Sequence, residues 1–318
     1  MKNSNKNEKI LILDFGSQVT QLIARRVRES GVYSEIFPYT KWEEGLKKIK
    51  PKGIILSGGP ASTVDSSSPQ VSLEILNSDV PVLGICYGQQ TLCSQLGGKV
   101  EHSTKREFGR ANIKIIGKSD FFRDFENNKE NEPVWMSHGD KVTELPEGFS
   151  VIAKSENAPF AAIANEDKRV YGVQFHPEVV HTPNGSKMLE NFTHHICGCS
   201  GEWTIESFKE TAIERIKKQV GDGTVVCGLS GGVDSSVAAV LLHEAIGKQL
   251  TCIYVDTGLM RENETEEVVG MFRDHFNIPL IHVDARQDFL SDLNGINDPE
   301  RKRKIIGSKF IDLSLIHI

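Results

Sequence analysis

The sequence contains no apolar run long enough for a secretory signal or a membrane-spanning helix. Residues 1–9 are polar and lysine-bearing, and the apolar stretch that follows them is short. Its six cysteines lack the spacing of a disulfide framework, so a reducing compartment would leave them as thiols. We therefore expect a cytoplasmic protein with no membrane partner, in which at least one cysteine is free for chemistry.

The sequence also lacks an excess of positive charge, internal repeats and low-complexity tracts. Its formal net charge is −6, which does not suggest a partner as acidic as a nucleic acid. The local basic run Arg301–Lys304 is more typical of a solvated helix face. Hydrophobic residues make up 38% and charged residues 25%, near globular averages, and 318 residues suggest about two domains.

Short β-branched runs alternate with helical patterns, which indicates an α/β fold. Buried strands are expected over 10–13, 53–56 and 82–85, and a more antiparallel stretch over 111–175 precedes a closing helix over 188–196. The alternation restarts with strands over 225–229, 251–255 and 280–283, separated by helices. We expect a first domain over residues 8–198, a linker over 199–203 and a second domain over 204–318.

Cys86 lies where a strand turns sharply into a helix, in the segment Gly84-Ile85-Cys86-Tyr87-Gly88. Flanking glycines allow such a turn to close, and a helix N-terminus favours the thiolate over the thiol. The pattern is that of a nucleophile elbow with sulfur in place of oxygen. The alternative is a buried structural cysteine, which is the interpretation we give to Cys93.

A thiolate nucleophile needs a proton shuttle, and His176 and Glu178 follow a strand-like run. Two residues apart in extended backbone, their side chains point the same way, so the carboxylate can orient the imidazole. The sequence therefore predicts a Cys86–His176–Glu178 triad. His181 has no comparable companion and is read as a surface residue.

An oxyanion hole needs backbone N–H donors in a tight turn. The segment Ser57-Gly58-Gly59-Pro60 follows a strand and can offer them, so the Gly59 and Tyr87 N–H groups are our candidates. A plain loop turn is the alternative. The segment 135–140 could touch glutamine or a domain interface, and the residues do not decide between the two.

These motifs, together with Leu13-Asp14-Phe15-Gly16-Ser17-Gln18, resemble the class I (triad-type) glutamine amidotransferases, whose domain is flavodoxin-like. The resemblance implies that the cysteine forms a glutamyl thioester, that the histidine acts as acid and base, and that the glutamate orients it. It also implies that Gln90, Gly58 and Gly59 help to hold glutamine.

A second motif combines a strand over 225–229, a glycine–serine loop and a helix over 237–246. Loop N–H groups, serine hydroxyls and the helix N-terminus can surround a phosphate. A Walker lysine is missing, so a different cleavage of ATP is implied. The loop consists of Ser230, Gly231, Gly232, Val233, Asp234, Ser235 and Ser236.

The loop resembles that of the ATP pyrophosphatases, which split ATP into AMP and pyrophosphate in an adenine nucleotide α hydrolase-like parallel-sheet domain. By this resemblance Asp234 helps to hold Mg²⁺, and Val255 faces the adenine. ATP and Mg²⁺ are the expected cofactors.

The two motifs in this order resemble the family of glutamine-hydrolysing GMP synthases, over about residues 9–312. In that family ammonia from glutamine reacts with adenylylated xanthosine monophosphate (XMP) to give GMP. Glutamine, ATP and XMP are thus the implied substrates, and a homodimer is the implied assembly. Residues 313–318 do not match, and the rest of the ATP domain and the dimerisation domain are missing, so we expect glutaminase activity at most.

Several alternatives remain open. Another triad amidotransferase, as in anthranilate or carbamoyl phosphate synthesis, would lack the second motif, whereas a tRNA-thiolating or other sulfur-transfer enzyme would lack the triad. Asparagine synthetase is disfavoured because its nucleophile is an N-terminal cysteine. A non-catalytic fragment is possible, and His194, His195, Cys197 and Cys199 are crowded enough to raise a zinc site, although helix-end packing suits them better.

Overall fold

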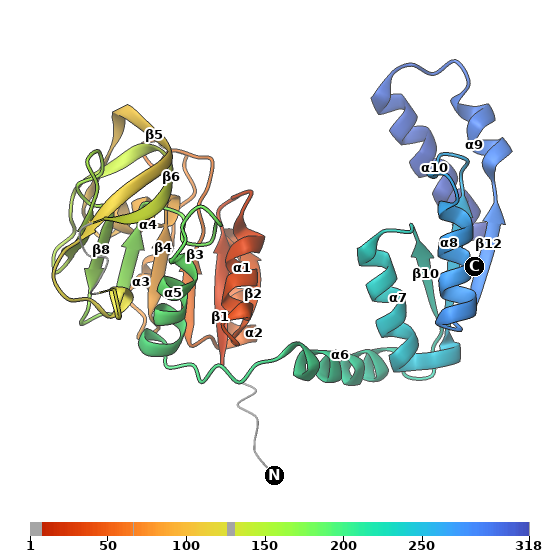
Figure 1. Cartoon of the computed structure of the whole chain (residues 1–318), viewed down its shortest axis with the longest axis horizontal. Helices are drawn as coiled ribbons and strands as arrows, with labels where there is room; N and C mark the ends of the chain where they lie inside the picture. The colour runs from red at the N-terminus through yellow and green to blue at the C-terminus, as the bar shows by residue number, and fades with distance from the viewer. Residues whose placement is uncertain (1–7, 66, 126–130, 318) are drawn as a thin grey trace, which may run out of the picture. The chain divides into compact units, whose positions relative to one another are not determined.

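The computed structural model describes residues 8–65, 67–125 and 131–317, without the side chains of 103–106 and 314–317. The polar segment 1–7 and the last residue of the non-matching tail, to which two sequence predictions refer, lie outside these ranges. The chain divides into two compact units, residues 1–204 and 205–318 (Figure 1). Within the described ranges, no helix is both long and apolar enough to cross a membrane.

In the first unit, nine described strands form one sheet in the order β2-β1-β3-β4-β9-β8-β7-β5-β6. The first five are parallel and the others pair antiparallel. The more antiparallel stretch predicted over 111–175 is therefore confirmed except for its last strand, β9, which pairs antiparallel with β8 but parallel with β4. The parallel strands are β1 (Lys9–Asp14), β2 (Tyr33–Pro38), β3 (Gly53–Leu56), β4 (Val82–Ile85) and β9 (Val170–Val173). The antiparallel strands are β5 (Lys99–Ile115), β6 (Glu132–Glu144), β7 (Ser150–Lys154) and β8 (Ala162–Asn165).

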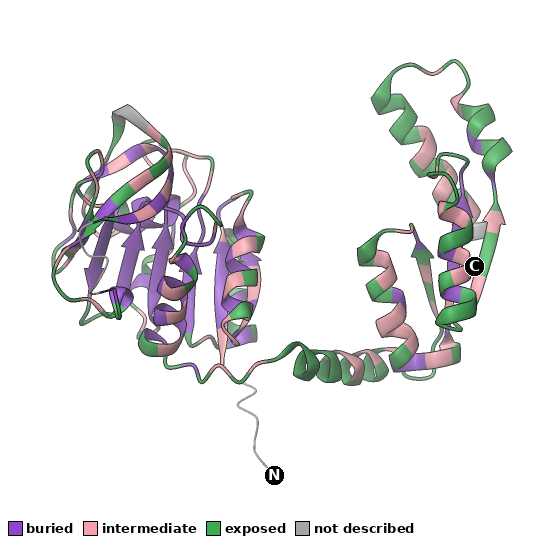
Figure 2. Cartoon of the chain, in the orientation of Figure 1, coloured by how far each residue is buried: buried purple, intermediate pink, exposed green. Residues whose placement is uncertain are grey.

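Alternating side chains of β1, β3, β4 and β9 enter two different cores, which is why these four strands are almost uniformly buried (Figure 2). In β1, Ile10 and Ile12 pack with α1 and α5, whereas Leu11 and Leu13 pack on the opposite face with residues of α2, α3 and α4. The sheet is thus covered by helices on both faces. The helices are α1 (Thr20–Glu29), α2 (Trp42–Ile49), α3 (Leu73–Leu76), α4 (Tyr87–Gln95) and α5 (Gly185–Glu190), with a π-helical segment over Asn191–Ile196 and single 3₁₀ turns over Tyr39–Lys41 and Asp120–Phe122.

The segment after this unit's last helix packs on the unit's own surface. The Trp203 N–H donates to the Gly31 carbonyl at 2.9 Å, and the Trp203 ring lies 6.0 Å from that of Tyr33. Cys199 is buried. The residues expected to form a linker therefore lie against α1 and β2.

The second unit is built on a three-stranded parallel sheet in the order β10-β11-β12. Its strands are β10 (Val225–Leu229), β11 (Leu250–Asp256) and β12 (Leu280–Asp284). Its helices are α6 (Ile205–Val220), α7 (Val233–Ile246), α8 (Glu264–Gly270), α9 (Arg286–Leu293) and α10 (Pro299–His317), with a π-helical segment over Met271–His275 and a 3₁₀ turn over Gly247–Gln249. The whole chain is thus α/β, with a large mixed sheet followed by a small parallel one, as predicted.

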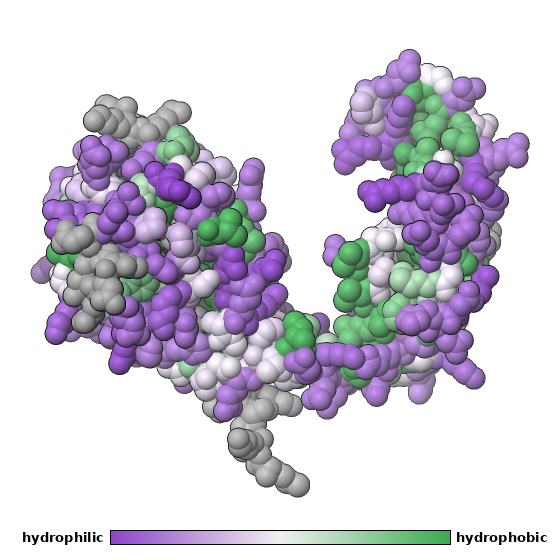
Figure 3. Space-filling view, in the orientation of Figure 1, coloured by the Kyte–Doolittle hydropathy of each residue, from purple (hydrophilic) through white to green (hydrophobic). Residues whose placement is uncertain are grey.

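The second unit leaves several apolar side chains in its surface. Val226 on β10 and Ile281 on β12 are partly open to solvent on the two edge strands, and Val233 and Val237 on α7 are more exposed still. Apolar groups are visible in the surface of this unit (Figure 3). Central β11 is covered on both faces: Tyr254 packs with α7 and α8, and Val255 packs with α9.

Candidate active site

The predicted nucleophile, its histidine and the glycine turn follow the carboxyl ends of neighbouring parallel strands. The sheet aligns Leu56 of β3 with Gly84 of β4, and Ile85 of β4 with Val173 of β9. The segments that leave these strands therefore emerge at the same edge of the sheet, where open α/β sheets commonly bind their ligands. Residues nearly a hundred positions apart meet in this way.

Cys86 occupies a strained turn between β4 and α4. Its φ is +53° and its ψ −106°, in the region that favours glycine, and its N–H donates to the Val173 carbonyl at 2.7 Å. The neighbouring glycines are sterically required, because a Cβ on Gly84 would lie 2.6 Å from the backbone carbon of Gly88. The turn places the buried sulfur directly before a helix N-terminus.

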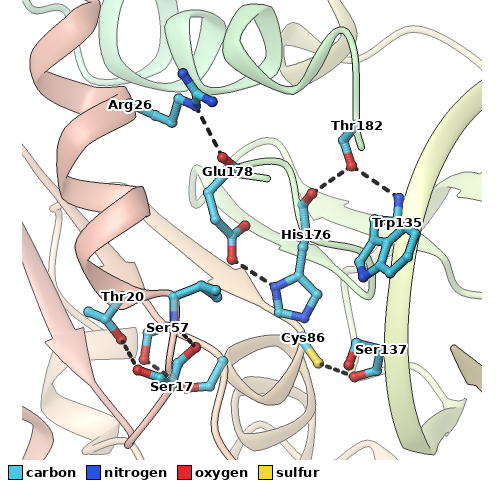
Figure 4. Close-up of polar contacts among 12 residues, drawn as sticks. Ser17, Thr20, Arg26, Ser57, Cys86, Trp135, Ser137, His176, Glu178 and Thr182 are labelled. Atoms are coloured by element: carbon cyan, nitrogen blue, oxygen red, sulfur yellow. Dashed lines mark hydrogen bonds and ion pairs between the residues drawn. The ribbon is translucent and has the colours of Figure 1, made fainter. Parts of the chain in front are cut away.

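His176 and Glu178 form a buried pair beside this sulfur (Figure 4). The imidazole Nδ1 lies 2.7 Å from Glu178 Oε1, and the other carboxylate oxygen has no hydrogen-bond partner among the described residues. The Arg26 Nε–H donates to the backbone carbonyl of Glu178 at 3.1 Å, which ties this loop to α1. The carboxylate is thus directed at the imidazole.

The charge state of His176 is controlled by its two partners. Burial alone would lower the pKa of His176, but hydrogen bonds to Cys86 and Glu178 and the charges of those groups raise it to about 10. An imidazolium is therefore favoured between the sulfur and the carboxylate. The structure places the three side chains of the predicted triad in hydrogen-bonding order.

Strand β6 contributes backbone groups to this site. The His176 N–H donates to the Trp135 carbonyl at 2.9 Å, and the Cys86 thiol lies 3.4 Å from the Ser137 carbonyl oxygen. Thr182 bridges the two segments: its hydroxyl donates to the His176 carbonyl at 2.6 Å and accepts from the Trp135 N–H at 3.0 Å. The segment 135–140, left undecided by the sequence, thus lies against the cysteine and the histidine.

The glycine turn after β3 lies against the same group of residues. A Cβ on Gly58 would come within 3.3 Å of His176 Cε1, and one on Gly59 within 2.8 Å of the Phe15 carbonyl oxygen. The preceding Ser57 hydroxyl accepts from the Phe15 N–H at 3.0 Å and lies 3.4 Å from Asp14 Oδ1. The turn is therefore fitted closely to the end of β1.

Two buried glutamines lie behind Cys86. Gln90, predicted to hold glutamine, donates from Nε2 to the Asp140 carbonyl at 2.9 Å and to Gln174 Oε1 at 3.3 Å. The Nε2 of Gln174 lies 3.8 Å from Cys86 Sγ. The sequence argument missed Gln174, although it precedes His176 by two residues in an extended segment.

A second His–Glu pair, of which the histidine is buried, occupies the β5–β6 hairpin. His138 Nε2 lies 3.4 Å from Glu107 Oε2, and His138 Nδ1 lies 3.0 Å from the Asp140 carbonyl. Burial lowers the pKa of His138 despite Glu107, and the charge of His176 acts in the same direction. His138 is therefore favoured as a neutral ring near the charged His176.

The second unit presents the predicted phosphate loop between β10 and α7. Ser230 Oγ accepts from the Gly232 N–H and lies 3.1 Å from Ser235 Oγ, and the hydroxyls of Ser235 and Ser236 donate to the Gly232 carbonyl. Gly231 has a φ of +77°, which favours glycine. The last four residues of the expected loop, Val233 to Ser236, are already helical because α7 begins at Val233.

Asp234 belongs to this loop, and Val255 and Asp256 end the neighbouring strand β11. Asp234 is exposed in the first turn of α7, and Val255, expected to face adenine, is buried with Ala285 and Phe289. Asp256, which the sequence argument missed, accepts from the Gly258 N–H and the Thr265 hydroxyl and lies 3.7 Å from Arg286 Nε. Among the described residues, no group of three or more His, Cys, Asp or Glu side chains is arranged to hold a metal. This also holds for the crowded set His194, His195, Cys197 and Cys199.

Comparison with protein families matches each unit separately. Residues 11–196 match the glutamine amidotransferase class-I model, and residues 205–298 match the NAD synthase model. Among solved structures, a candidate GMP synthase subunit from Thermoplasma acidophilum is similar with a TM-score of 0.53 and 28% identity, covering 65% of this chain and 98% of that one.

Curated relatives extend over both units. GMP synthase (glutamine-hydrolysing) from Phenylobacterium zucineum is 61% identical over 98% of this chain, and the enzyme of the same name from Agrobacterium fabrum is 60% identical over 96%. The chain spans only 60% and 58% of the length of these relatives. Since the class-I model covers more than half of the sequence and the cysteine and histidine motifs lie in its matched region, the chain belongs to the class I glutamine amidotransferase family, with a second unit that matches the NAD synthase model.

Proposed function

We propose that this chain hydrolyses glutamine at Cys86 and supplies the ammonia to an ATP-dependent synthesis of GMP. Glutamine hydrolysis is supported by one observation: His176 is buried between Cys86 and Glu178 and interacts with both. A strained turn, an adjacent imidazole and a carboxylate with one partner are the parts that thiol-based acyl transfer needs.

Each residue of the triad has a role in the proposed reaction. The Cys86 sulfur attacks the side-chain carboxamide carbon of glutamine, and the His176 imidazolium gives its Nε2 proton to the departing nitrogen, so ammonia leaves and a thioester remains. His176 then takes a proton from water, whose oxygen attacks the thioester and releases glutamate. Glu178 holds the imidazole in place and stabilises its positive charge.

The tetrahedral intermediates of both steps carry a negative oxygen. The Gly59 and Tyr87 N–H groups are the proposed donors to this oxygen, since Tyr87 opens α4 directly after Cys86 and a Cβ on Gly59 would lie 3.4 Å from the Tyr87 ring. Gly58 and Gln90 are the further residues proposed to hold glutamine. The burial of Gln90 favours an indirect role in holding it.

The second unit is proposed to bind ATP through Ser230–Ser236. Loop N–H groups, three hydroxyls and the N-terminus of α7 suit a pyrophosphate. A single exposed carboxylate, Asp234, fits a magnesium ion held mainly by nucleotide phosphates, as Mg²⁺ in nucleotide sites commonly is. Bound Mg²⁺ would neutralise charge on the pyrophosphate, while Val255 borders the proposed adenine site.

The relatives' names support glutamine as a substrate and GMP as the product. XMP as the acceptor, and AMP and pyrophosphate as the other products, complete the proposal. A homodimer in the full-length protein, a cytoplasmic location and the absence of nucleic-acid and membrane partners belong to the same proposal. A synthase of another class, for instance one making anthranilate, is disfavoured because the second unit matches the NAD synthase model.

The test incubates the purified chain with glutamine, with and without ATP and XMP, and follows glutamate, AMP and GMP separately. We expect the chain to release glutamate when glutamine is the only substrate added. Cys86→Ala should abolish glutamate release, whereas Cys93→Ala, a change at the buried thiol on α4, should retain it. Glutamate release that survives Cys86→Ala would refute the proposed nucleophile.

A further inference from the structure

The buried amide of Gln174 faces the sulfur of Cys86 from the segment that carries His176. Gln174 is 1% exposed, and its backbone N–H donates to the Ala161 carbonyl at 2.8 Å, so its position is fixed by the sheet. The side-chain nitrogen is 3.8 Å from Cys86 Sγ. An uncharged donor with no access to solvent is thus directed at the proposed nucleophile.

The hydrogen-bond chain determines which end of the Gln174 amide faces the sulfur. The Asp140 backbone carbonyl can only accept, so the Gln90 atom beside it, at 2.9 Å, must be the NH₂ group. That same NH₂ group lies 3.3 Å from Gln174, which must therefore present its oxygen to Gln90. The remaining NH₂ group of Gln174 is then the one that faces Cys86.

The partners of the sulfur favour opposite protonation states. The Ser137 carbonyl, 3.4 Å from Sγ, can only accept and so favours the neutral thiol. The Gln174 NH₂ group can donate, and donation to the charged form favours the thiolate. His176 and Glu178 are the titratable groups of the site that interact with this sulfur or with each other, and His138, paired with Glu107 in the β5–β6 hairpin, is affected by the charge of His176.

We propose that Gln174 is a further residue of the nucleophile site: its side-chain NH₂ group donates to the Cys86 thiolate, and Gln90 positions it by fixing the orientation of its amide. This inference deepens the proposed function, on which it rests. Gln90 thereby acts behind the cysteine through Gln174, as a positioning residue.

The test measures the rate at which iodoacetamide alkylates Cys86 as a function of pH, with peptide mass spectrometry to separate Cys86 from the other cysteines. Gln174→Met keeps the length of the side chain but removes the donor. We expect the midpoint of the alkylation profile to move upward by about one pH unit, which is about a tenfold slower reaction at pH values below the midpoint. A wild-type profile in Gln174→Met overturns the proposal.

Two further variants separate donation from packing. Gln90→Met should move the midpoint in the same direction by a smaller amount, because the Gln174 amide is then free to rotate. Gln89→Met is the matched control: Gln89 is an equally buried neighbour on α4, but it donates to the Phe160 carbonyl at 2.8 Å and lies outside the chain of amides. An equal shift in Gln89→Met would mean that loss of any buried amide suffices, which also overturns the proposal.

Circular dichroism identifies variants that do not fold. Should Gln174→Met fail to fold, Gln90→Met decides, and an unchanged profile in that variant contradicts the inference. Alkylation requires no glutamine, so the two proposals can fail separately. A chain that releases no glutamate but shows the expected shifts would refute the glutaminase function and leave the amide contact standing.

Discussion

At the scale of single residues, the site depends on a carboxylate that serves one histidine. Glu178 is fully buried, and its Oε1 is bound to His176 while its Oε2 has no partner among the residues that the structure describes. Such a carboxylate adds little to the fold by itself, because burying its charge is costly. Its contribution is to the charge of the imidazole.

The change Glu178→Gln should retain the hydrogen bond to His176 but remove the negative charge. We expect kcat/KM for glutamine hydrolysis to fall by about 10²–10⁴-fold, as when a buried triad carboxylate becomes an amide. The control is Glu132→Gln, which alters another buried carboxylate that binds Asn184 instead of a histidine. Equal losses in both variants would contradict a specific role for Glu178.

The raised pKa of His176 predicts a pH-dependent stability. Its pKa is about 10 in the folded chain against an ordinary 6.5, so the folded state binds the proton more tightly. The stabilisation is fully present below about pH 6.5 and is lost as pH rises through about 10. Urea unfolding of the first unit should be measured at several pH values, for the unchanged chain and for His176→Gln. The unfolding free energy of the unchanged chain should exceed that of the variant by an amount that shrinks toward pH 10. A difference that stays constant would contradict the ion pair.

At the scale of elements, the glycine turn after β3 is shaped by close approach. A Cβ on Gly59 would lie 2.8 Å from the Phe15 carbonyl oxygen, a backbone atom that cannot rotate away. Gly59→Ala should therefore displace the turn, destabilise the first unit by about 1–3 kcal/mol and slow glutamine hydrolysis by about 10²-fold if a proposed oxyanion donor moves.

Thermal unfolding and glutamate release measure these effects. Gly307→Ala is the matched control, because Gly307 lies on α10 with no atom within 4 Å of its ideal Cβ. It should leave the rate unchanged. A fully active and stable Gly59→Ala variant would show that this turn can relax.

The sequence predicted short apolar strands more accurately than long polar ones. The ranges 53–56, 82–85 and 225–229 coincide with β3, β4 and β10. The runs of β3 and β4 are buried on both faces, whereas β10 is an edge strand with exposed positions. By contrast, β5 and β6 extend well beyond the expected 111–116 and 134–136, because a hairpin paired along its length tolerates charged residues on an open face. Strand β8 was missed: its sequence Ala162–Asn165 is alanine-rich and has little β propensity.

The triad could be predicted because glycines, a cysteine and a His–Glu pair are distinctive. Gln174 and Thr182 could not, because a glutamine or a threonine gains a role here only through the pairing of β6 with the segment after β9. The early start of α7 was missed for a related reason. Serine and aspartate are common in loops but also suit the first turn of a helix.

At the scale of the whole molecule, each unit has cores of its own. The two main cores of the first unit lie on opposite faces of its sheet, and the second unit has its own pair around β11. The second sheet has only three described strands and leaves Val226 and Val233 in its surface. We therefore expect the second unit to be the less stable of the two.

Differential scanning calorimetry should resolve two transitions, with the second unit unfolding at the lower temperature. ATP with Mg²⁺ should stabilise only the second unit, and so raise only its transition temperature. At a hundredfold excess of ATP over its dissociation constant, the free energy of unfolding of that unit should increase by about 2.7 kcal/mol. Cys86→Ala should not alter this response. A single transition, or a shift of the first unit with ATP, would contradict separate units.

The pairing of β4 with β9 constrains chain length as well as composition. Tyr171, Val173 and Phe175 enter the core beneath α5, while Gln174 and His176 occupy the alternate positions and interact with Cys86. The proposed function therefore requires that these two sets of side chains keep opposite faces of one extended segment. One residue inserted directly after β9 would move each following side chain to the opposite face of the segment, so that Phe175 would take the place of His176 beside Cys86. Two would restore the parity yet displace the imidazole by about 6.6 Å along the strand. Insertions and deletions there should therefore be far more damaging than most substitutions.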